Sequence, residues 1–412
     1  MVAFRHFLPA VIAAAALTAC GGGGGTPATP PAVTGGINNS GIAATPNTVI
    51  PLSAWTAGKS VSYDISAVDI TTNTYYLSDR TSKAVDVAST NTDTLIAQAK
   101  NNFIGSTGNN GTSDPNGEVV LPGVGAYDGD VGKVTLVSTK GTILATIPIT
   151  SPATGAATGN RTDEGCYDSV DGLVEFSNGA EAGTAQDPDF TTWISTKTNT
   201  VVAQFAMTAP QFVNDEGLES CVYDPNTGNF FLNNDGEGPN TEGELDVIPA
   251  ASVVAGAPTV TKQYGEGMCN PSGIALAPSN GNMAITCDTD PGTKQMTLFT
   301  TDSNPSAFVP NYNCGGGDEM WYDPVMNRFY LAARYWTATG ISAGDPSNGV
   351  PPNSAYTPVV GVFNAANEQW IANIPVGYGV HSVTTDQNGS VWIPQPPTAT
   401  AAGGIGVYIL SR

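Results

Sequence analysis

Short runs of alternating apolar and polar residues recur along the chain from about residue 60 onward, separated by turns rich in Asp, Asn, Gly and Pro. Alternation over four to eight residues predicts strands with one buried face, and the turn residues predict hairpins between them. The strongest turns read Asp-Pro-x-x-Gly and precede an aromatic-rich strand, as in YDPNTGNFFLNN at 223–234. No amphipathic helical segment of useful length competes with the strands, so we expect an all-β protein.

The strand pattern repeats as a unit. Each unit has a short strand, the turn, an aromatic-rich strand, a polar loop and a third strand rich in Val and Ile, and a fourth strand usually follows. Seven copies align at intervals of 45 to 63 residues. Their aligned turn residues are Asp69, Asp114, Asp168, Asp224, Ala277, Asp323 and Asp386. Four-stranded units repeated at about 50 residues predict a seven-bladed β-propeller.

The two ends of the repeat region complement each other. The seventh copy lacks a fourth strand before the chain stops at Arg412, whereas the strand-like segment NTVIPL at 47–52 precedes the first copy. We therefore expect the N-terminal strand to complete the last blade and close the ring. The predicted propeller domain spans residues 47–412.

The first 46 residues have a different pattern. A basic start at Arg5 and a short apolar run lead to Leu17-Thr18-Ala19-Cys20, which resembles the lipobox of bacterial lipoproteins. The resemblance implies a signal peptide over 1–19 that is removed and a Cys20 that is acylated. Residues 20–46 are rich in Gly, Pro and Thr and predict a flexible tether. Gly21 after the cysteine favours an outer-membrane anchor in the cell envelope, facing the periplasm or the cell surface. The alternative is an ordinary secretory signal with a chance cysteine.

Charge narrows the classes of partner. The chain has 36 acidic and 14 basic residues, and its net charge is −22. We exclude nucleic acid as a partner, because binding its backbone needs clustered Lys and Arg. Outside the signal peptide, no stretch reaches the roughly 18 apolar residues of a membrane span. The only membrane contact that we expect is therefore the lipid anchor.

Three segments carry a resemblance to a known family. They are DISAVDITTNTYYLSDRTSKAVDV at 64–87, CNPSGIALAPSNG at 269–281 and DEMWYDPVMNRFYLAAR at 318–334. They resemble the NHL and YVTN-type propeller repeats of bacterial surface proteins and, more distantly, are similar to gluconolactonase/regucalcin-like propellers. The first resemblance implies a blade architecture over residues 48–412 without specifying an activity. The second implies calcium-dependent hydrolase or lyase chemistry, although seven copies depart from the six of that family.

Polar residues recur at one place in the repeat, five and four positions before the turn residue. The first strand of each blade lines the channel of a propeller, so these side chains are expected to converge at one channel mouth. They are Asp64, Asn109, Asn110, Asp163, Glu164, Glu219, Ser272, Asp318, Glu319, His381 and Ser382, with Asn270 nearby.

Two interpretations of the six carboxylates compete. Crowded carboxylates repel one another, and a Ca²⁺ or Mg²⁺ ion with oxygen ligands would relieve that repulsion. The predicted ligands are Asp64, Asp163, Glu164, Glu219, Asp318 and Glu319. Alternatively, the carboxylates are solvated or accept hydrogen bonds from neighbouring backbone N–H groups. His381 is the only histidine left after signal removal, and it could be a general acid or base, a metal ligand or a structural hydrogen-bonding group.

Further candidate residues lie in a long loop and at the cysteines. The segment 335–358 could form a wall over the channel mouth, where Arg334 and Trp336, with Asn109, Asn110 and Asn270, would contact a polar ligand such as a carbohydrate. Cys166 and Cys221 occupy near-equivalent positions in adjacent units and predict a disulfide. Cys269 could pair with Cys287 or with Cys314.

Two functions follow from these observations. The first is a lipid-anchored propeller that binds a small molecule, glycan or protein on its top face, with a divalent cation as a possible addition at the channel mouth. The second is a metal-dependent hydrolase or lyase in which His381 transfers protons and the ion activates water.

Overall fold

The computed structural model describes residues 41–409, except 44, 180–187, 209–210, 213–216, 237–239, 242, 268, 288–295, 301–308, 312 and 337–355. The predicted signal peptide, Cys20 and most of the predicted tether lie outside the described residues. Most of the long segment 335–358 also lies outside them.

The described strands form seven four-stranded antiparallel sheets. Six of them follow chain order: β2 (Ser66–Asp69), β3 (Thr74–Asp79), β4 (Ala84–Ser89), β5 (Thr94–Ala99); β6 (Glu118–Leu121), β7 (Gly125–Asp130), β8 (Lys133–Ser138), β9 (Ile143–Pro148); β10 (Arg161–Asp168), β11 (Leu173–Gly179), β12 (Phe190–Ser195), β13 (Thr200–Ala206); β14 (Leu218–Asp224), β15 (Asn229–Asn234), β16 (Glu244–Pro249), β17 (Lys262–Gly265); β18 (Pro271–Ala277), β19 (Asn282–Cys287), β20 (Met296–Thr300), β21 (Val309–Asn311); and β22 (Met320–Asp323), β23 (Arg328–Ala333), β24 (Val359–Asn364), β25 (Trp370–Pro375).

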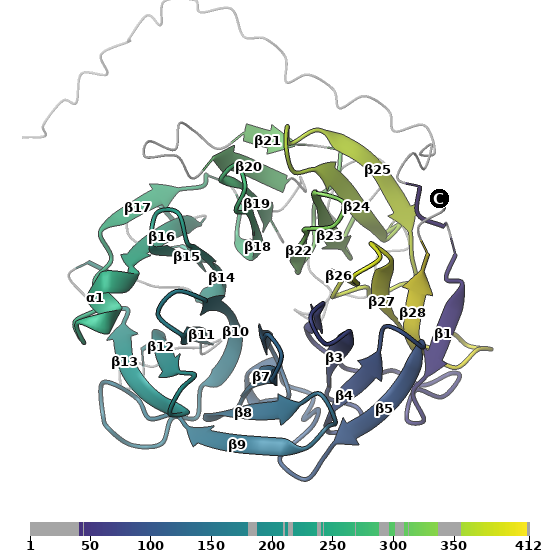
Figure 1. The fold of residues 1–412 in the computed structure, drawn as a ribbon, viewed down its shortest axis with the longest axis horizontal. Helices are drawn as coiled ribbons and strands as arrows, with labels where there is room; N and C mark the ends of the chain where they lie inside the picture. The colour runs from purple at the N-terminus through teal and green to yellow at the C-terminus, as the bar shows by residue number, and fades with distance from the viewer. Residues whose placement is uncertain are drawn as a thin grey trace, which may run out of the picture. The chain divides into compact units, whose positions relative to one another are not determined.

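The remaining sheet joins the two ends of the described chain. It contains β26 (Thr384–Thr385), β27 (Val391–Gln395), β28 (Gly404–Tyr408) and β1 (Thr48–Pro51). β1 pairs with β28 from Thr48 opposite Val407 to Pro51 opposite Gly404, as the sequence indicated. The sheets stand radially around a central axis, with the first strand of each sheet innermost (Figure 1). The fold is therefore an all-β propeller.

The inner turns explain why the repeat has its sequence. The carboxylate of the turn aspartate accepts a hydrogen bond from the backbone N–H two residues later, as Asp69 does from Thr71 and Asp224 does from Asn226. An aspartate that folds back on its own backbone in this way stabilises a tight turn. The residue before the second strand has a positive φ, for example 57° at Asn73 and 68° at Gly228. Asn and Gly tolerate this left-handed conformation at little cost.

One repeat copy departs from the prediction. The second copy was aligned on Asp114, but the turn of that sheet lies at 122–124 and contains Gly123 with a φ of 81°. Asp114 lies before β6, where its carboxylate accepts a hydrogen bond from the N–H of Gly105 at 3.1 Å. The prediction of seven equivalent blades is therefore wrong, because only six of the copies form the predicted turn. The sheet β6–β9 is the divergent one.

The core lies between neighbouring sheets, which pack face to face. Fully buried aromatic side chains such as Trp55, Trp193 and Trp392 fill these spaces. The helical elements among the described residues are a five-residue helix, α1 (Ala250–Val254), and a single 3-10 turn at Asn110–Thr112. Neither is long and apolar enough to cross a membrane, and this holds for every helix in the described part of the chain.

Candidate binding site in the central channel

Three of the predicted residues meet at the end of the channel where the inner strands begin. His381 Nε2 lies 2.7 Å from Asp64 Oδ1 and 2.6 Å from Asp318 Oδ2. Both aspartates are buried, whereas the His381 side chain is 20% exposed. The sequence therefore correctly predicted that these side chains converge.

Three arginines neutralise this end of the channel. Arg80 follows β3 and pairs with Asp64, whereas Arg161 begins β10 and pairs with Asp163. Arg334 follows β23, and its Nη1 lies 3.0 Å from Asp318 Oδ2 and also contacts His381 Nδ1. We call this set the ion-pair network. Its members are Asp64, Arg80, Arg161, Asp163, Asp318, Arg334 and His381.

Sequence reasoning missed two of these arginines. The predicted channel residues stand five and four positions before the turn residue, whereas Arg161 stands seven positions before Asp168 and Arg80 follows a second strand. A signal was present for one of them, because Arg80 and Arg334 both stand eleven residues after their turn residue, Asp69 and Asp323. Equivalent positions in two blades, both occupied by arginine in a chain poor in basic residues, indicate a shared place near the axis.

The three aspartates of the ion-pair network differ: the pKa values of Asp64 and Asp318 are lowered, whereas at Asp163 burial outweighs the charge of Arg161 and raises the pKa. Burial alone would raise the pKa of Asp64, but the charge of Arg80, the hydrogen bond with His381 and the charge of Arg161 outweigh burial and lower this pKa to about 2. The pKa of Asp318 is likewise lowered, because Arg334 and His381 outweigh the effect of burial. Burial lowers the pKa of His381, but the charge of Asp318 and the hydrogen bonds with both aspartates more than compensate, and the net shift is upward.

A second set of acids lies further along the channel. Glu118, Glu164 and Glu319 are 8%, 6% and 5% exposed, and we call them the carboxyl cluster. Burial raises the pKa of Glu118 and of Glu319 to about 8, although hydrogen bonds from Ser78 to Glu118 and from Ser382 to Glu319 act in the opposite direction. The pKa of Glu164 is also raised by burial and by the nearby charges of Asp318 and Asp163.

The carboxyl cluster forms the inner end of a pocket in the channel. The pocket has a volume of about 270 Å³ and is lined by the inner strands β10, β14, β18 and β22, with Ile65 and Glu118. Its aromatic residues are Tyr167, Tyr223, Trp321 and Tyr322. The wall is buried at the carboxyl cluster and exposed at Pro278, next to an inner turn.

Several predicted ligand-binding residues lie elsewhere. Asn109 and Asn110 are exposed, and Asn110 Oδ1 accepts a 2.6 Å hydrogen bond from Arg80 Nη1. Their place in the channel is taken by Asn116 and Gly117, which stand five and four positions before Leu121 at the end of β6. A side chain at Gly117 would place its Cβ 2.1 Å from the Asp163 carbonyl oxygen, so only glycine fits there.

Trp336 and Arg334, two further predicted ligand contacts, are held by other parts of the protein. Trp336 is 3% exposed and packs in the core beside Phe363, so its predicted role as an open ligand surface is wrong. Arg334 is held in the ion-pair network and lies over the ring of Tyr335, 4.6 Å from its centroid. Asn270 is partly buried and has a φ of 49°, and Glu219 is partly buried with its backbone carbonyl hydrogen-bonded to Ser177 Oγ.

Some of the predicted metal ligands form ion pairs instead. Among its six proposed ligands, Asp64, Asp163 and Asp318 already pair with guanidinium groups. Glu219 interacts with the charge of Arg161, which lowers its pKa, although burial raises that pKa more strongly. The metal-like grouping found among the described residues is a different one, Cys166, Glu175 and Cys221. Its two sulfur atoms are joined as a disulfide, and a disulfide does not offer the thiolate that binds metal. Calcium or magnesium binding stays a prediction.

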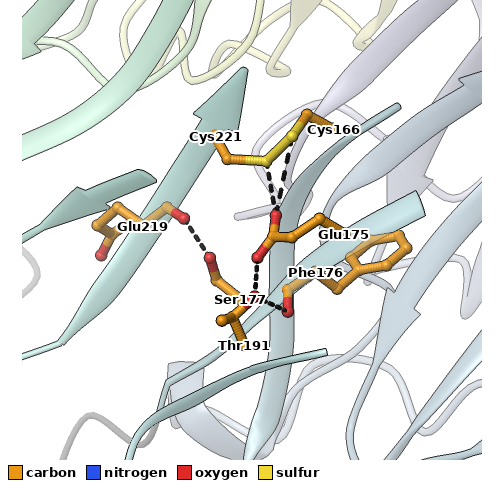
Figure 2. Close-up of a disulfide and its surroundings, with 7 residues drawn as sticks. All are labelled: Cys166, Glu175, Phe176, Ser177, Thr191, Glu219 and Cys221. Atoms are coloured by element: carbon orange, nitrogen blue, oxygen red, sulfur yellow. Dashed lines mark hydrogen bonds between the residues drawn. A yellow bond between two sulfur atoms is a disulfide. The ribbon is translucent and has the colours of Figure 1, made fainter. Parts of the chain in front are cut away.

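The structure resolves the cysteine alternatives. Cys166 and Cys221 form a disulfide between β10 and β14, as predicted, and Cys269 pairs with Cys287 within one sheet. Cys314 is a buried free thiol. The Cys166–Cys221 disulfide belongs to the wall of the channel pocket, and the carboxyl group of Glu175 lies beside it (Figure 2).

Comparisons with known proteins identify the fold alone. No protein-family model matches the chain, and no curated protein matches it either. Among solved structures, 1136 chains match, including hydrazine synthase of Kuenenia stuttgartiensis with a TM-score of 0.58 and 14% sequence identity. That match covers 85% of this chain and 95% of the other. The structural match supports the propeller architecture, but at such low sequence identity it says nothing about activity.

Proposed function

We propose that this protein is a lipid-anchored propeller of the cell envelope that binds a small ligand carrying an ammonium group in its central channel. The anchor would be the acylated Cys20, followed by the tether over 20–46, and the outer membrane is the site that Gly21 favours. The pocket is the observation that carries the binding function.

The chemistry of the pocket wall favours a cation. The residues that line it include the three carboxyl groups of the carboxyl cluster and four aromatic rings, and none of them is Lys or Arg. A carboxylate attracts an ammonium group directly, and the face of an aromatic ring attracts it through the ring quadrupole. The volume of about 270 Å³ lies just below the roughly 300 Å³ at which pockets for drug-sized ligands start, so the pocket suits only a small molecule.

The raised pKa values predict how binding depends on pH. At neutral pH Glu118 and Glu319 are largely protonated, because their pKa values are about 8. A bound ammonium group favours the ionised carboxylate, so binding should release a proton and should strengthen as the pH rises from 6 to 9.

Choline and its neutral isostere 3,3-dimethylbutanol test the proposal. The charge of choline does not change with pH, so calorimetric titration of the mature protein should show affinity rising about tenfold from pH 6 to 9, with proton release. Glu164→Gln should weaken choline binding about tenfold at pH 8, a loss of about 1.4 kcal/mol. Glu266→Gln, which changes a buried glutamate outside the pocket wall, is the matched control and should bind normally.

Two outcomes would contradict the proposal. Equal binding of choline and 3,3-dimethylbutanol would mean that the pocket does not select for charge, and no binding of either would remove the ammonium ligand. Calcium added to chelator-treated protein tests the sequence-based metal prediction separately, since a rise in the melting temperature would support that prediction. Mass spectrometry of the mature protein tests acylation of Cys20.

A further inference from the structure

The Cys166–Cys221 disulfide has an unusual neighbour. Glu175 Oε2 lies 2.6 Å from Cys221 Sγ and 3.9 Å from Cys166 Sγ, and the other carboxyl oxygen accepts a hydrogen bond from Thr191 Oγ1 (Figure 2). Glu175 is 1% exposed. A carboxyl group is thus held against one sulfur of a disulfide, in a place that solvent does not reach.

The disulfide is also accessible from one side. Both cysteines line the channel pocket, and Cys166 is the more exposed of the two, at 8% against 3% for Cys221. A small thiol in the pocket would therefore meet Cys166 first. Cys221 is the sulfur that lies against Glu175.

We propose that the Cys166–Cys221 disulfide exchanges with small thiols that enter the channel, and that Glu175 supplies and recovers the proton of the Cys221 thiol. This activity is independent of the ammonium ligand proposed above. It requires only that the pocket admit a thiol.

The exchange balances in two steps. An external thiolate attacks Cys166 Sγ, a mixed disulfide forms, the Cys166–Cys221 bond breaks, and the Cys221 sulfur takes the proton of the Glu175 carboxylic acid. A second external thiolate then attacks the external sulfur of the mixed disulfide and releases the Cys166 thiolate and an oxidised external disulfide. Two electrons pass from two thiols to the protein, and the reverse reaction returns the Cys221 proton to the Glu175 carboxylate. Protonating the leaving sulfur speeds the first step, because a neutral thiol leaves more readily than a thiolate.

The protonation of Glu175 fits this role. Burial raises its pKa to about 8, although the hydrogen bond from Thr191 lowers it. The group is therefore a carboxylic acid at neutral pH and a carboxylate in more alkaline solution. The rate of reduction of Cys166–Cys221, divided by the concentration of the external thiolate, should stay constant up to about pH 7. Well above pH 8 it should fall tenfold per pH unit.

The second disulfide of the molecule is an internal control. Cys269 and Cys287 are 1% and 3% exposed, and neither belongs to the wall of the channel pocket. Cys269 Sγ lies 3.7 Å from a backbone carbonyl oxygen, that of Thr286. Both disulfides can be followed in one sample by quenching with an alkylating reagent and by mass spectrometry of the labelled peptides.

The experiment measures the reduction of both disulfides in the folded mature protein by 2-mercaptoethanol from pH 6 to 10. We expect Cys166–Cys221 to react at least tenfold faster than Cys269–Cys287, with the pH profile described above. Glu175→Gln should slow the reduction of Cys166–Cys221 about tenfold to a hundredfold at pH 7 and should remove its pH dependence. Neither Glu175→Gln nor the control Glu266→Gln should change the rate at Cys269–Cys287.

Equal rates at the two disulfides would overturn the proposal, and so would an unchanged rate and profile in Glu175→Gln. If circular dichroism shows that Glu175→Gln does not fold, the pH dependence of the reduction rate in the wild-type protein still tests the proposal. A rate per thiolate at Cys166–Cys221 that does not fall above pH 8 would exclude proton donation by Glu175.

Discussion

Two aspartates of the ion-pair network, Asp163 and Asp318, are each followed in sequence by a glutamate of the carboxyl cluster, but the carboxyl groups of Asp318 and Glu319 have opposite properties. Asp318 and Glu319 are adjacent in sequence, and both are buried. The pKa of Asp318 is lowered because Arg334 and His381 outweigh its burial, whereas burial without a guanidinium partner raises that of Glu319 to about 8. Paired cations outweigh burial at Asp64 and Asp318, but not at Asp163, where burial raises the pKa although the carboxylate pairs with Arg161.

Removing a cation from the ion-pair network should have the largest effect. Arg80 is 5% exposed and donates hydrogen bonds to Asp64, Asn110 and Asn116. Arg80→Met would leave the Asp64 charge buried with a weaker set of partners. We expect a loss of about 3–5 kcal/mol in the free energy of unfolding, measured by urea denaturation at pH 7. Lys140→Met, at an exposed position, should change it by less than about 0.5 kcal/mol. A similar small change in Arg80→Met would show that the ion-pair network does not stabilise the fold.

The pH dependence of stability should separate the two regions. Asp64 has a folded pKa of about 2, below its ordinary value, so its contribution is present above about pH 4 and is lost as the pH falls toward 2. Glu118, Glu175 and Glu319 have folded pKa values of about 8, above the ordinary value, so the folded state binds more protons between about pH 4.5 and 8. Stability should fall as the pH rises through this window, by up to about 1.4 kcal/mol per pH unit for each group.

Thermal melting from pH 2 to 9 measures this dependence. We expect the highest melting temperature between about pH 4 and 6. A maximum at pH 8 or above would contradict the protonated state of the carboxyl cluster.

Replacing one acid of the carboxyl cluster should have the smallest effect when stability is measured at pH 5. Glu118→Gln substitutes an amide for a carboxyl group that is already neutral below its pKa of about 8. We expect little change in stability at pH 5 and a gain at pH 8.5, because the variant avoids the loss of up to about 1.4 kcal/mol per pH unit that Glu118 contributes between these pH values. Denaturation at both pH values checks the difference. A loss greater than about 2 kcal/mol at pH 8.5 would mean that Glu118 acts as a charged partner, as Asp64 does.

Most of the fold was predictable from the sequence because its signals are local. Strand alternation, the turn aspartate and the Asn or Gly with a positive φ all act within a few residues, and they located six of the inner turns. The sheet β6–β9 escaped because the segment around Asp114 contains the same residue types, Asp-Pro-Asn-Gly, as a true turn. Those residues precede the strand there, and a local pattern cannot distinguish the two positions.

The candidate site was predictable only in part. Counting positions from the turn brought Asp64, Asp318 and His381 together correctly, because a repeat places equivalent residues at equivalent radii. The same count missed Arg80 and Arg161, which reach the axis from the end of a second strand and from the start of a long first strand. The prediction of a loop wall over the channel mouth placed Trp336 at an open surface, although this side chain packs in the core.

The sequence by itself therefore determined the all-β propeller fold, the closure by the N-terminal strand and the convergence of acids on the axis, since each follows from local periodicity and from repetition. Only the tertiary structure decided which of those acids are charged. Protonation depends on the distance to a guanidinium group and on exclusion of water, and both depend on residues that are far apart in the chain. The same reason places Glu175 against the Cys166–Cys221 disulfide, a contact between three strands of two sheets.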